Sequence, residues 1–361
     1  YADHRDLHSF PTRRSSDLTT SFPRATQPQM NCEQISALAE MITGGGLIDE
    51  AAAISLVSIP HDRLPCLFAA ASRIRGHFFG NSVSLCAIIN AKSGRCPEDC
   101  AFCAQSAHHS TSAAVYPLLD DEQIITGARA AADAGASCYG IVTSGSGIVP
   151  GNELDRLCSV IKEIRNLGII APSASLGTIN SETAAILRQA GLVTYHHNLE
   201  TSRSFFPHIC STHDYEKDVE TVRVAKEAGF RVCSGGLFGL GESMEQRIEM
   251  AFTLKELGVD SVPINFLDPV PGTPLESATP LTPLECLHTI AIFRFILPEA
   301  HITVCGGRER NLRELQSWIF LAGASGMMTG NYLTKQGRQP DTDRRMIEDL
   351  GLHIEKELCC G

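Results

Sequence analysis

The sequence predicts an α/β protein built as a (β/α)8 barrel of the TIM type with a helical extension on its N-terminal side. From residue 83 to residue 352, a β-rich run, a loop and a polar-apolar helical run recur eight times. Gly135, Gly168 and Gly191 directly follow helical runs, where glycine adopts the left-handed conformation that ends a helix. The β-branched runs are typical of strands that are buried on both faces. Eight such units favour a closed barrel over the alternative, an open doubly wound sheet.

The strand and helix of each unit can be placed in chain order. We expect strand and helix pairs at 82–91 and 120–135, 137–145 and 152–168, 169–177 and 181–191, 192–200 and 215–229, 230–241 and 243–258, 261–270 and 281–297, 301–309 and 311–324, and 326–334 and 342–351. In a barrel of this kind, chemistry sits at the C-terminal ends of the strands and in the loops after them.

The segments outside the barrel, 83–352, differ in character. Residues 30–82 predict two or three helices, of which 32–45 is the clearest, and these should cap the N-terminal end of the barrel or dock on its side. Residues 1–29 are expected to be a non-native or disordered leader, because 1–18 have no regular periodicity and resemble translated adapter sequence, and Met30 is a plausible start. Residues 353–361 form a C-terminal tail with the pair Cys359 and Cys360.

Composition excludes several classes of protein. The net charge is -11 and the basic residues are scattered, which argues against a nucleic-acid partner. No run reaches the roughly 18 to 20 apolar residues of a membrane span, and no signal peptide is evident, so a cytoplasmic protein is expected. In a reducing compartment, clustered cysteines indicate metal or redox chemistry rather than disulfides. The isolated Cys66, Cys158 and Cys286 are expected to be small buried hydrophobic residues.

The segment "RCPEDCAFCAQS", residues 95–106, carries three cysteines, Cys96, Cys100 and Cys103, in a CxxxCxxC pattern. Structural zinc sites usually have four ligands in two separated pairs, whereas here no fourth cysteine is near, although His108 and His109 are close enough to be considered. Three thiolates on a cubane iron–sulfur cluster leave one iron open. An open metal position generally binds a substrate or cofactor.

CxxxCxxC is the signature of the radical S-adenosylmethionine (SAM) enzymes. Together with "YHHNLETS", "VCSGGLFGLGE", "VPINFL" and "CGGRE" in this order, it makes the chain similar to the biotin synthases over about residues 35–352. The resemblance implies insertion of sulfur into dethiobiotin by a [4Fe-4S] cluster on Cys96, Cys100 and Cys103. That cluster chelates and cleaves SAM to a 5′-deoxyadenosyl radical, which abstracts hydrogen from unactivated carbons. A homodimer and reduced flavodoxin or ferredoxin as electron donor are further expectations.

The resemblance also implies roles for individual residues at the strand ends. A carboxylate suits the ribose diol of SAM, because it can accept from both hydroxyl groups. The expected SAM contacts are Tyr139, Asn198 and Glu200, and the expected dethiobiotin contacts are Lys92, His196, His197, Asn265 and Thr334. Cys233 and Arg308 match two ligands of the second, [2Fe-2S] cluster of the best-known biotin synthases and are expected to act in catalysis.

The other two ligand positions of that second cluster are Gly140 and Ser173, which offer no thiolate. We therefore expect an altered auxiliary iron–sulfur cluster that donates sulfur, held by Cys233, Cys305 and Arg308 with one or two further thiolates. Candidates for these are Cys138, Cys359 and Cys360.

Two other functions remain open at this stage. One is another radical SAM enzyme on the same barrel, such as a hydrogenase-cofactor maturase, and the other is a non-catalytic iron–sulfur or zinc protein that senses redox state. Formation of biotin would exclude the first, and formation of 5′-deoxyadenosine would exclude the second.

Overall fold

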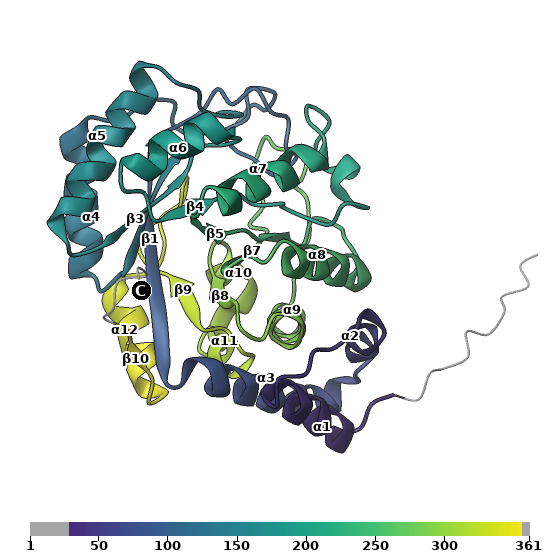
Figure 1. The fold of residues 1–361 in the computed structure, drawn as a ribbon. Coiled ribbons are helices and arrows are strands. Elements are labelled where there is room, and N and C mark those ends of the chain that lie inside the picture. Colours follow the sequence, from purple (N-terminus) through teal and green to yellow (C-terminus); the bar gives the residue numbers. More distant parts are fainter. Residues whose placement is uncertain (1–28, 356–361) are drawn as a thin grey trace, which may run out of the picture.

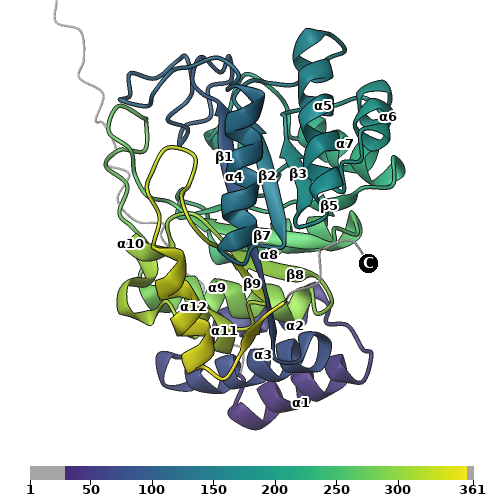
Figure 2. The same ribbon diagram turned by 90° about the vertical axis from the view of Figure 1, so that its left-hand side faces the viewer.

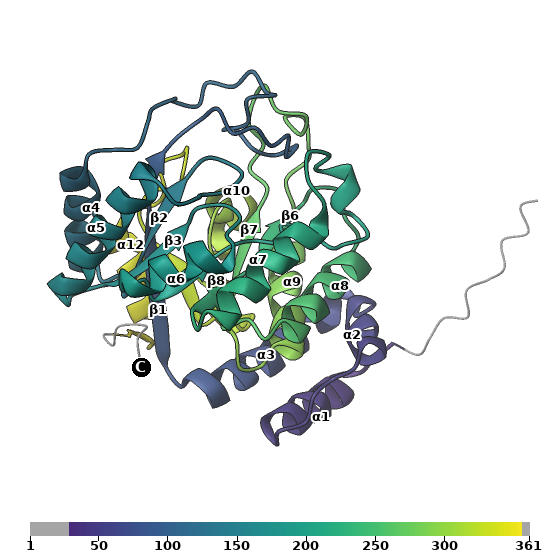
Figure 3. The ribbon, with the colours of Figure 1, turned by 45° about the horizontal axis from the view of Figure 1, so that its top comes forward.

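The computed structural model, which describes residues 29–355, contains a closed parallel barrel of eight strand positions (Figures 1 and 3). The long strand β1 (Ser82–Lys92) pairs with β2 (Cys138–Thr143) on one side and with β9 (Gly326–Met328) on the other, which closes the sheet. The others follow in chain order: β3 (Ala171–Ser175), β4 (Thr194–His196), β5 (Arg231–Cys233), β6 (Gly236–Phe238), β7 (Ser261–Phe266) and β8 (His301–Val304). β5 and β6 share one position, since both pair with β7. The predicted barrel is confirmed.

Helices cover the outside of the barrel because each carries an apolar face. In α5, for example, Leu154, Leu157 and Ile161 are buried, and the helix ends at Gly168 in the left-handed conformation. The outer helices are α4 (Asp121–Asp133), α5 (Asn152–Leu167), α6 (Ser181–Gln189), α7 (Tyr215–Glu227), α8 (Met244–Glu256), α9 (Pro283–Ile296) and α12 (Pro340–Asp349).

Two expected elements differ from the sequence prediction: the strand at 230–241 is divided into β5 and β6, and the helix at 311–324 is broken. The chain there forms three short pieces, α10 (Arg308–Leu312), the 3-10 turn η3 (Arg313–Leu315) and α11 (Trp318–Leu321). Arg313 has a φ of 51°, which no residue of a continuous right-handed helix adopts, so the helix breaks at this position.

The N-terminal helices lie at the end of the barrel opposite the loop that follows β1 (Figure 2). They are α1 (Cys32–Thr43), α2 (Glu50–Val57), the 3-10 turn η1 (His61–Arg63) and α3 (Leu64–Phe79). α3 packs against α1 and α9, and α2 against α8 and α9. Packing of α1 on α3 brings Cys32 and Cys66 together as a disulfide. The expectation that Cys66 is an isolated buried residue is therefore wrong, whereas Cys158 and Cys286 are buried as predicted.

Two buried arginines hold the turns at the N-terminal end of the barrel, and one of them, Arg75, lies in the helical extension. Arg75 of α3 donates to the backbone carbonyls of Gly80, Ser82 and Ala324. Arg294 of α9 is fully buried and donates to four carbonyls, those of Gly323, Leu297, Pro298 and Ala300. A buried cation requires such partners, so these carbonyls fix the turns at this end of the barrel.

The short strand β10 (His353–Ile354) pairs with the first residues of β1, so the described chain ends at the N-terminal side of the barrel. The leader expected before Met30 and the pair Cys359 and Cys360 fall outside residues 29–355. Among the residues that the structure describes, no helix is long and apolar enough to cross a membrane. The division into 30–82, 83–352 and 353–361 stays a prediction.

Candidate active site

A cavity of about 810 Å³ occupies the interior of the barrel and is called the barrel cavity below. It reaches from the cysteine loop, residues 95–106, at the C-terminal ends of the strands to Glu355 at the opposite end. Barrels of this kind are normally filled by large branched side chains. Here many positions that line the interior carry small or polar residues, namely Ser84, Gly140, Ser173, Thr194, Ser261 and Thr303.

Cys96, Cys100 and Cys103 all line the barrel cavity, as the sequence pattern predicts. The N–H of Cys96 donates to the carbonyl of Gln105, and the N–H of Cys103 to that of Cys100, so the loop folds back on itself. The ring nitrogens of His108 and His109 bond to backbone carbonyls of the same loop, at 2.9 and 3.0 Å. These two histidines are therefore engaged elsewhere, and the loop presents three thiols alone.

Two of the three thiols, those of Cys100 and Cys103, are kept neutral in the absence of a metal. Burial raises the pKa of Cys103 to about 11. The pKa of Cys100 is raised by its hydrogen bond with Cys210 and also by burial. Cationic iron is the partner that holds such buried thiols as thiolates, and three thiols on one short loop facing open space fit a cluster with one free iron position.

Asp99 anchors the cysteine loop to the segment between β4 and α7. Its Oδ1 accepts the N–H of Ser211 at 2.9 Å and the N–H of Thr212 at 3.3 Å, and its Oδ2 accepts the Ser211 hydroxyl. Burial works to raise the pKa of Asp99, but the hydrogen bonds, led by those from Ser211, outweigh it and hold that pKa well below its usual range. Asp99 is therefore a permanent carboxylate that positions the loop.

At the end of β4, His196, Asn198 and Glu200 form a connected row along the cavity wall. His196 Nε2 lies 3.1 Å from Asn198 Oδ1, and Asn198 Nδ2 donates to Glu200 Oε2 at 3.3 Å. Glu200 has a φ of 62°, a costly conformation for a non-glycine residue that is found mostly at functional sites. The N–H of Leu237 donates to its carbonyl at 2.8 Å, which ties it to β6.

The same row carries strongly shifted pKa values, a common sign of a functional site. Burial raises the pKa of Glu200 to about 8, and the Asp218 carboxylate adds to the effect. Burial lowers the pKa of His196 to about 4, so its ring is neutral near pH 7. Behind the row, Asp218 accepts from His197 at 2.9 Å and from His213 at 3.2 Å. Burial alone would raise the pKa of Asp218. The hydrogen bonds from the two histidines outweigh it, so the pKa is lowered and Asp218 stays a carboxylate.

Four further cysteines, on the strands or directly after them, line the cavity and are called the inner cysteines: Cys86, Cys138, Cys233 and Cys305. None of the four forms a disulfide. Cys86 and Cys138 are direct neighbours in the register of β1 and β2. A hydrogen bond with Cys305, followed by burial, raises the pKa of Cys86 well above its usual value. Thiols from separate strands facing one cavity fit the donor set of an iron–sulfur cluster.

On the wall formed by β7 and β8, Asn265 is fixed by the backbone. Its Nδ2 donates to the carbonyl of Gly236 at 3.2 Å, and its Oδ1 accepts the N–H of Gly306 at 3.0 Å. Thr334 lines the cavity near its mouth. Four of the residues predicted to contact dethiobiotin therefore line the cavity: Asn265, Thr334, His196 and His197.

Three predicted site residues do not line the barrel cavity. Arg308 is fully buried but donates to Asp343 Oδ2 of α12 at 2.7 Å, and its position gives no support to a role as cluster ligand. Tyr139 alternates with the inward residues of β2, so its hydroxyl points outward and donates to the carbonyl of Ile124 in α4. Lys92 ends β1 and pairs with Glu153 at 2.8 Å, which holds its ammonium against α5.

Sequence reasoning missed several residues of the site. Cys86 is the inward residue of β1 and was detectable by alternation with Ser84 and Ile88. Cys210 and His213 lie three residues apart in "CSTH", and only the fold shows that this segment contacts the cysteine loop.

Comparison with known proteins agrees with this geometry. The family model described as "Radical SAM superfamily" matches residues 91–266, and that described as "Biotin and Thiamin Synthesis associated domain" matches residues 263–353. Biotin synthase of Trichlorobacter lovleyi is 67% identical over 324 residues, 90% of this chain and 97% of that protein. The chain belongs to the biotin synthase family. The biotin synthase of Geobacter sulfurreducens is 62% identical and covers 89% of this chain and 97% of its own length.

As a biotin synthase, the protein is a radical SAM sulfurtransferase that acts on dethiobiotin with a [4Fe-4S] cluster, SAM and an auxiliary cluster, which confirms these expectations. Among solved structures, methylornithine synthase superposes with a TM-score of 0.77 at 22% identity, covering 88% of this chain and 97% of that one. An [FeFe]-hydrogenase maturase superposes with a TM-score of 0.77 at 17% identity, covering 91% and 76%. At these identities the likeness shows the barrel fold alone.

Proposed function

We propose that successive parts of the barrel cavity in this biotin synthase hold the different groups that take part in its reaction. Cys96, Cys100 and Cys103 hold the [4Fe-4S] cluster at the mouth, the β4 row holds SAM and dethiobiotin below it, and the inner cysteines hold the auxiliary cluster. When bound, the clusters supply the electron that cleaves SAM and the sulfur that enters dethiobiotin. The observation that carries this assignment is that all three groups of side chains line one continuous cavity.

Asn198 and Glu200 are proposed to bind SAM. The N–H of Gly235 donates to Asn198 Oδ1 at 3.2 Å, so the amide is held with its NH2 group toward Glu200. Glu200, held in place by its backbone bonds to β6, can accept from both ribose hydroxyls once it is ionised. Because the backbone already positions these two side chains, less conformational entropy is lost when SAM binds.

Dethiobiotin is proposed to bind between the β4 row and Asn265. The Asn265 amide keeps a second N–H and a second lone pair beyond its two backbone bonds, and these suit the acceptors and donors of a ureido ring. His196, neutral near pH 7, can donate or accept without adding charge. His197 is proposed to position the row through Asp218, and Thr334 to contact the carboxylate tail at the mouth.

The auxiliary cluster is proposed to be held by Cys233 and Cys305, with Cys86 and Cys138 as the further thiolates. Cys305 is the leading cause of the raised pKa of Cys86, and this coupling of a thiol on β1 to one at the end of β8 supports the choice. Cys138 was a candidate from the sequence, and Cys86 is added by its position. Gly140 and Ser173 occupy the same wall without supplying a thiolate.

The remaining features of the enzyme are proposals from family membership alone. These are a cytoplasmic location, a homodimer, and reduced flavodoxin or ferredoxin as electron donor. Sedimentation equilibrium of the reconstituted enzyme tests the dimer, and reduction of the cluster by each purified donor tests the electron route.

The deciding experiment is anaerobic reconstitution of the wild type and of a Cys96/Cys100/Cys103→Ala variant, followed by iron and sulfide analysis and Mössbauer spectroscopy. We expect the variant to keep a cluster, and that cluster to be lost when Cys305→Ala is added. Cys158→Ala, which replaces a buried cysteine outside the cavity, is the matched control. It should change neither the [4Fe-4S] cluster nor the auxiliary cluster. A variant without iron would show that the inner cysteines hold no cluster.

A further inference from the structure

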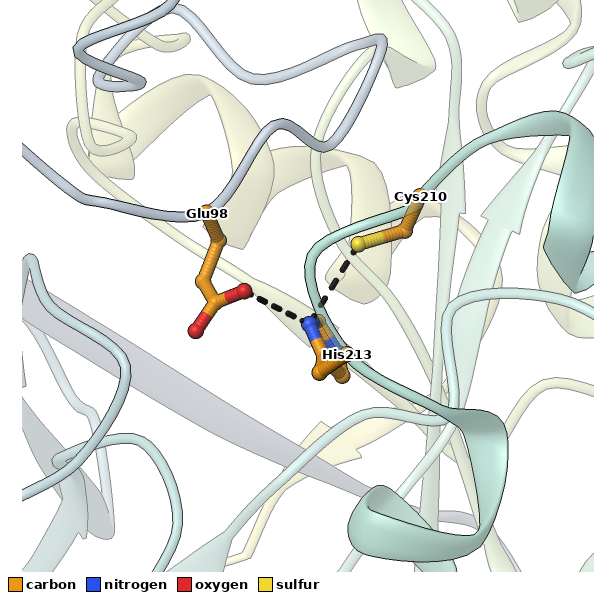
Figure 4. Close-up of side chains that lie close together, drawn as sticks. All are labelled: Glu98, Cys210 and His213. Carbon is orange, nitrogen blue, oxygen red and sulfur yellow. Dashed lines mark hydrogen bonds and ion pairs between the residues drawn. The ribbon is translucent and has the colours of Figure 1, made fainter.

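Beyond the thiols assigned above, a second set of metal-binding side chains converges at the rim of the barrel cavity. Glu98, from the cysteine loop, faces Cys210 and His213, from the segment between β4 and α7 (Figure 4). We call them the rim triad. Within residues 29–355, this is the only group of three histidine, cysteine or carboxylate side chains whose donor atoms all lie within 4.8 Å of one another. All three residues line the cavity, so an ion can reach them.

Within the rim triad, His213 Nδ1 faces the donor atoms of both other residues. His213 Nδ1 lies 2.8 Å from Glu98 Oε2 and 3.3 Å from Cys210 Sγ. One ring nitrogen has one lone pair or one hydrogen, so it cannot serve both neighbours well. Zn–N bonds of about 2.0–2.1 Å and Zn–S bonds of about 2.3 Å place tetrahedral ligand atoms roughly 3.3–3.6 Å apart. The distance from His213 to Cys210 lies at the lower end of this range, and an ion would require His213 and Glu98 to move apart by about half an ångström.

The other face of His213 has the partner expected of a metal-binding histidine. Its Nε2 lies 3.2 Å from Asp218 Oδ2, and the Asp218 side chain is only 6% exposed. A carboxylate behind the distal ring nitrogen fixes the tautomer and aims the other nitrogen at the ion. Asp218 is itself fixed by His197 at 2.9 Å, so the ring orientation does not depend on the triad alone.

We propose that Glu98, Cys210 and His213 form a Zn²⁺ site separate from the iron–sulfur ligands, with Asp218 as the residue that orients His213. Mixed cysteine, histidine and carboxylate ligands are those that zinc takes, and three protein ligands leave a fourth position for water. Cys100 Sγ, 4.0 Å from Cys210 Sγ, can occupy that position when no cluster is bound. Zinc has no redox chemistry, so an ion here would fix the cysteine loop to the β4–α7 segment without exchanging electrons with the cluster.

Zinc binding to the full-length chain tests the site without any turnover. The Cys96/Cys100/Cys103→Ala variant, free of metal, is titrated with ZnCl2 against a chelating dye. We expect it to bind one more equivalent of Zn²⁺ than the same chain carrying Cys210→Ala or His213→Gln. Asp218→Asn should weaken that equivalent by about 10- to 100-fold while keeping the stoichiometry, as loss of an orienting carboxylate does elsewhere.

Matched controls separate the rim triad from other thiols and from damage to the fold. Cys158→Ala and His288→Gln alter a buried cysteine and a half-buried histidine that do not line the cavity, and should leave the zinc count unchanged. Glu98→Gln is the variant least able to disturb folding, because its side chain lies on a loop. With Co²⁺ in place of Zn²⁺, the thiolate-to-metal charge-transfer band should weaken in Cys210→Ser.

An unchanged zinc count in both Cys210→Ala and His213→Gln would overturn the site, as would equal losses in the two controls. Either result would leave the assignment as a biotin synthase untouched, since biotin formation does not enter the measurement.

Discussion

At the scale of single residues, Glu200 combines three unusual properties. It has a left-handed backbone, it faces the cavity, and its carboxyl group has a pKa near 8 because of burial and the nearby Asp218 carboxylate. Glu200 is therefore largely protonated in the empty enzyme at neutral pH. Cationic SAM at this position favours the ionised form, so its binding should release a proton.

The sign of the Glu200 pKa shift predicts a pH-dependent stability. Because the folded-state pKa lies above the usual value of 4.5, the fold favours the protonated acid. The associated stabilisation is complete below about pH 4.5 and is lost as the pH rises through about 8. Thermal unfolding of the cluster-free chain should show a Tm that falls from pH 6 to pH 9 by roughly 2–4 °C more than that of Glu200→Gln. Parallel curves for the two proteins would refute the shift.

At the scale of elements, the cysteine loop depends on a contact with the β4–α7 segment, made by Asp99 and by the backbone bond from the Ala101 N–H to the Ile209 carbonyl, 2.8 Å long. The sequence predicts the three ligands of this loop because their spacing lies within it. It could not predict the support, since residues 99 and 211 meet only when β1 and β4 lie in one barrel.

Removing this support should loosen the cluster. In Asp99→Ala, the backbone N–H groups of Ser211 and Thr212 lose their acceptor, and the loop loses its fixed position. We expect iron transfer from the reconstituted enzyme to a chelator to be about 10-fold faster, in line with the effect of residues that position metal ligands. Asp155→Ala on the outside of α5 is the control, and equal rates for the two variants would contradict the anchoring role.

The disulfide between α1 and α3 gives a second prediction at this scale. Cys32 and Cys66 close a loop with a sequence separation of 34 residues, and restriction of the unfolded chain by such a loop stabilises the fold by about 3–4 kcal/mol in the chain-entropy model. Reduction, or Cys32→Ser with Cys66→Ser, should lower the denaturant midpoint accordingly. An unchanged midpoint under reductant would show that packing alone holds these helices.

At the scale of the whole molecule, the barrel was predictable because each strand and helix unit carries its own periodicity and six of the eight helical runs end in a glycine. The directions of individual side chains were harder to predict from the sequence. Alternation along β2 from the inward Cys138 would have placed Tyr139 outside the barrel. Arg308 follows Gly306 and Gly307, which end the regular alternation of β8, so no periodicity fixes its direction. Motif position alone therefore identified the residue but not its surroundings.

The lower end of the barrel depends on Arg294, and its replacement tests the architecture. In Arg294→Met, four backbone carbonyls lose their buried donor. We expect a loss of about 3–5 kcal/mol in the free energy of unfolding. Iron content after reconstitution should be unchanged at temperatures where the variant is folded, since Arg294 lies far from the cavity mouth. Arg188→Met, on the outer helix α6, is the control.

The lining of the barrel cavity extends from the cysteine loop past the inner cysteines to Glu355 at the opposite end of the barrel. Its lower end is lined by the partly exposed Arg231, Asp260 and Glu355. The inner cysteines therefore lie between the mouth of the cavity and a set of charged side chains, and not above an apolar floor.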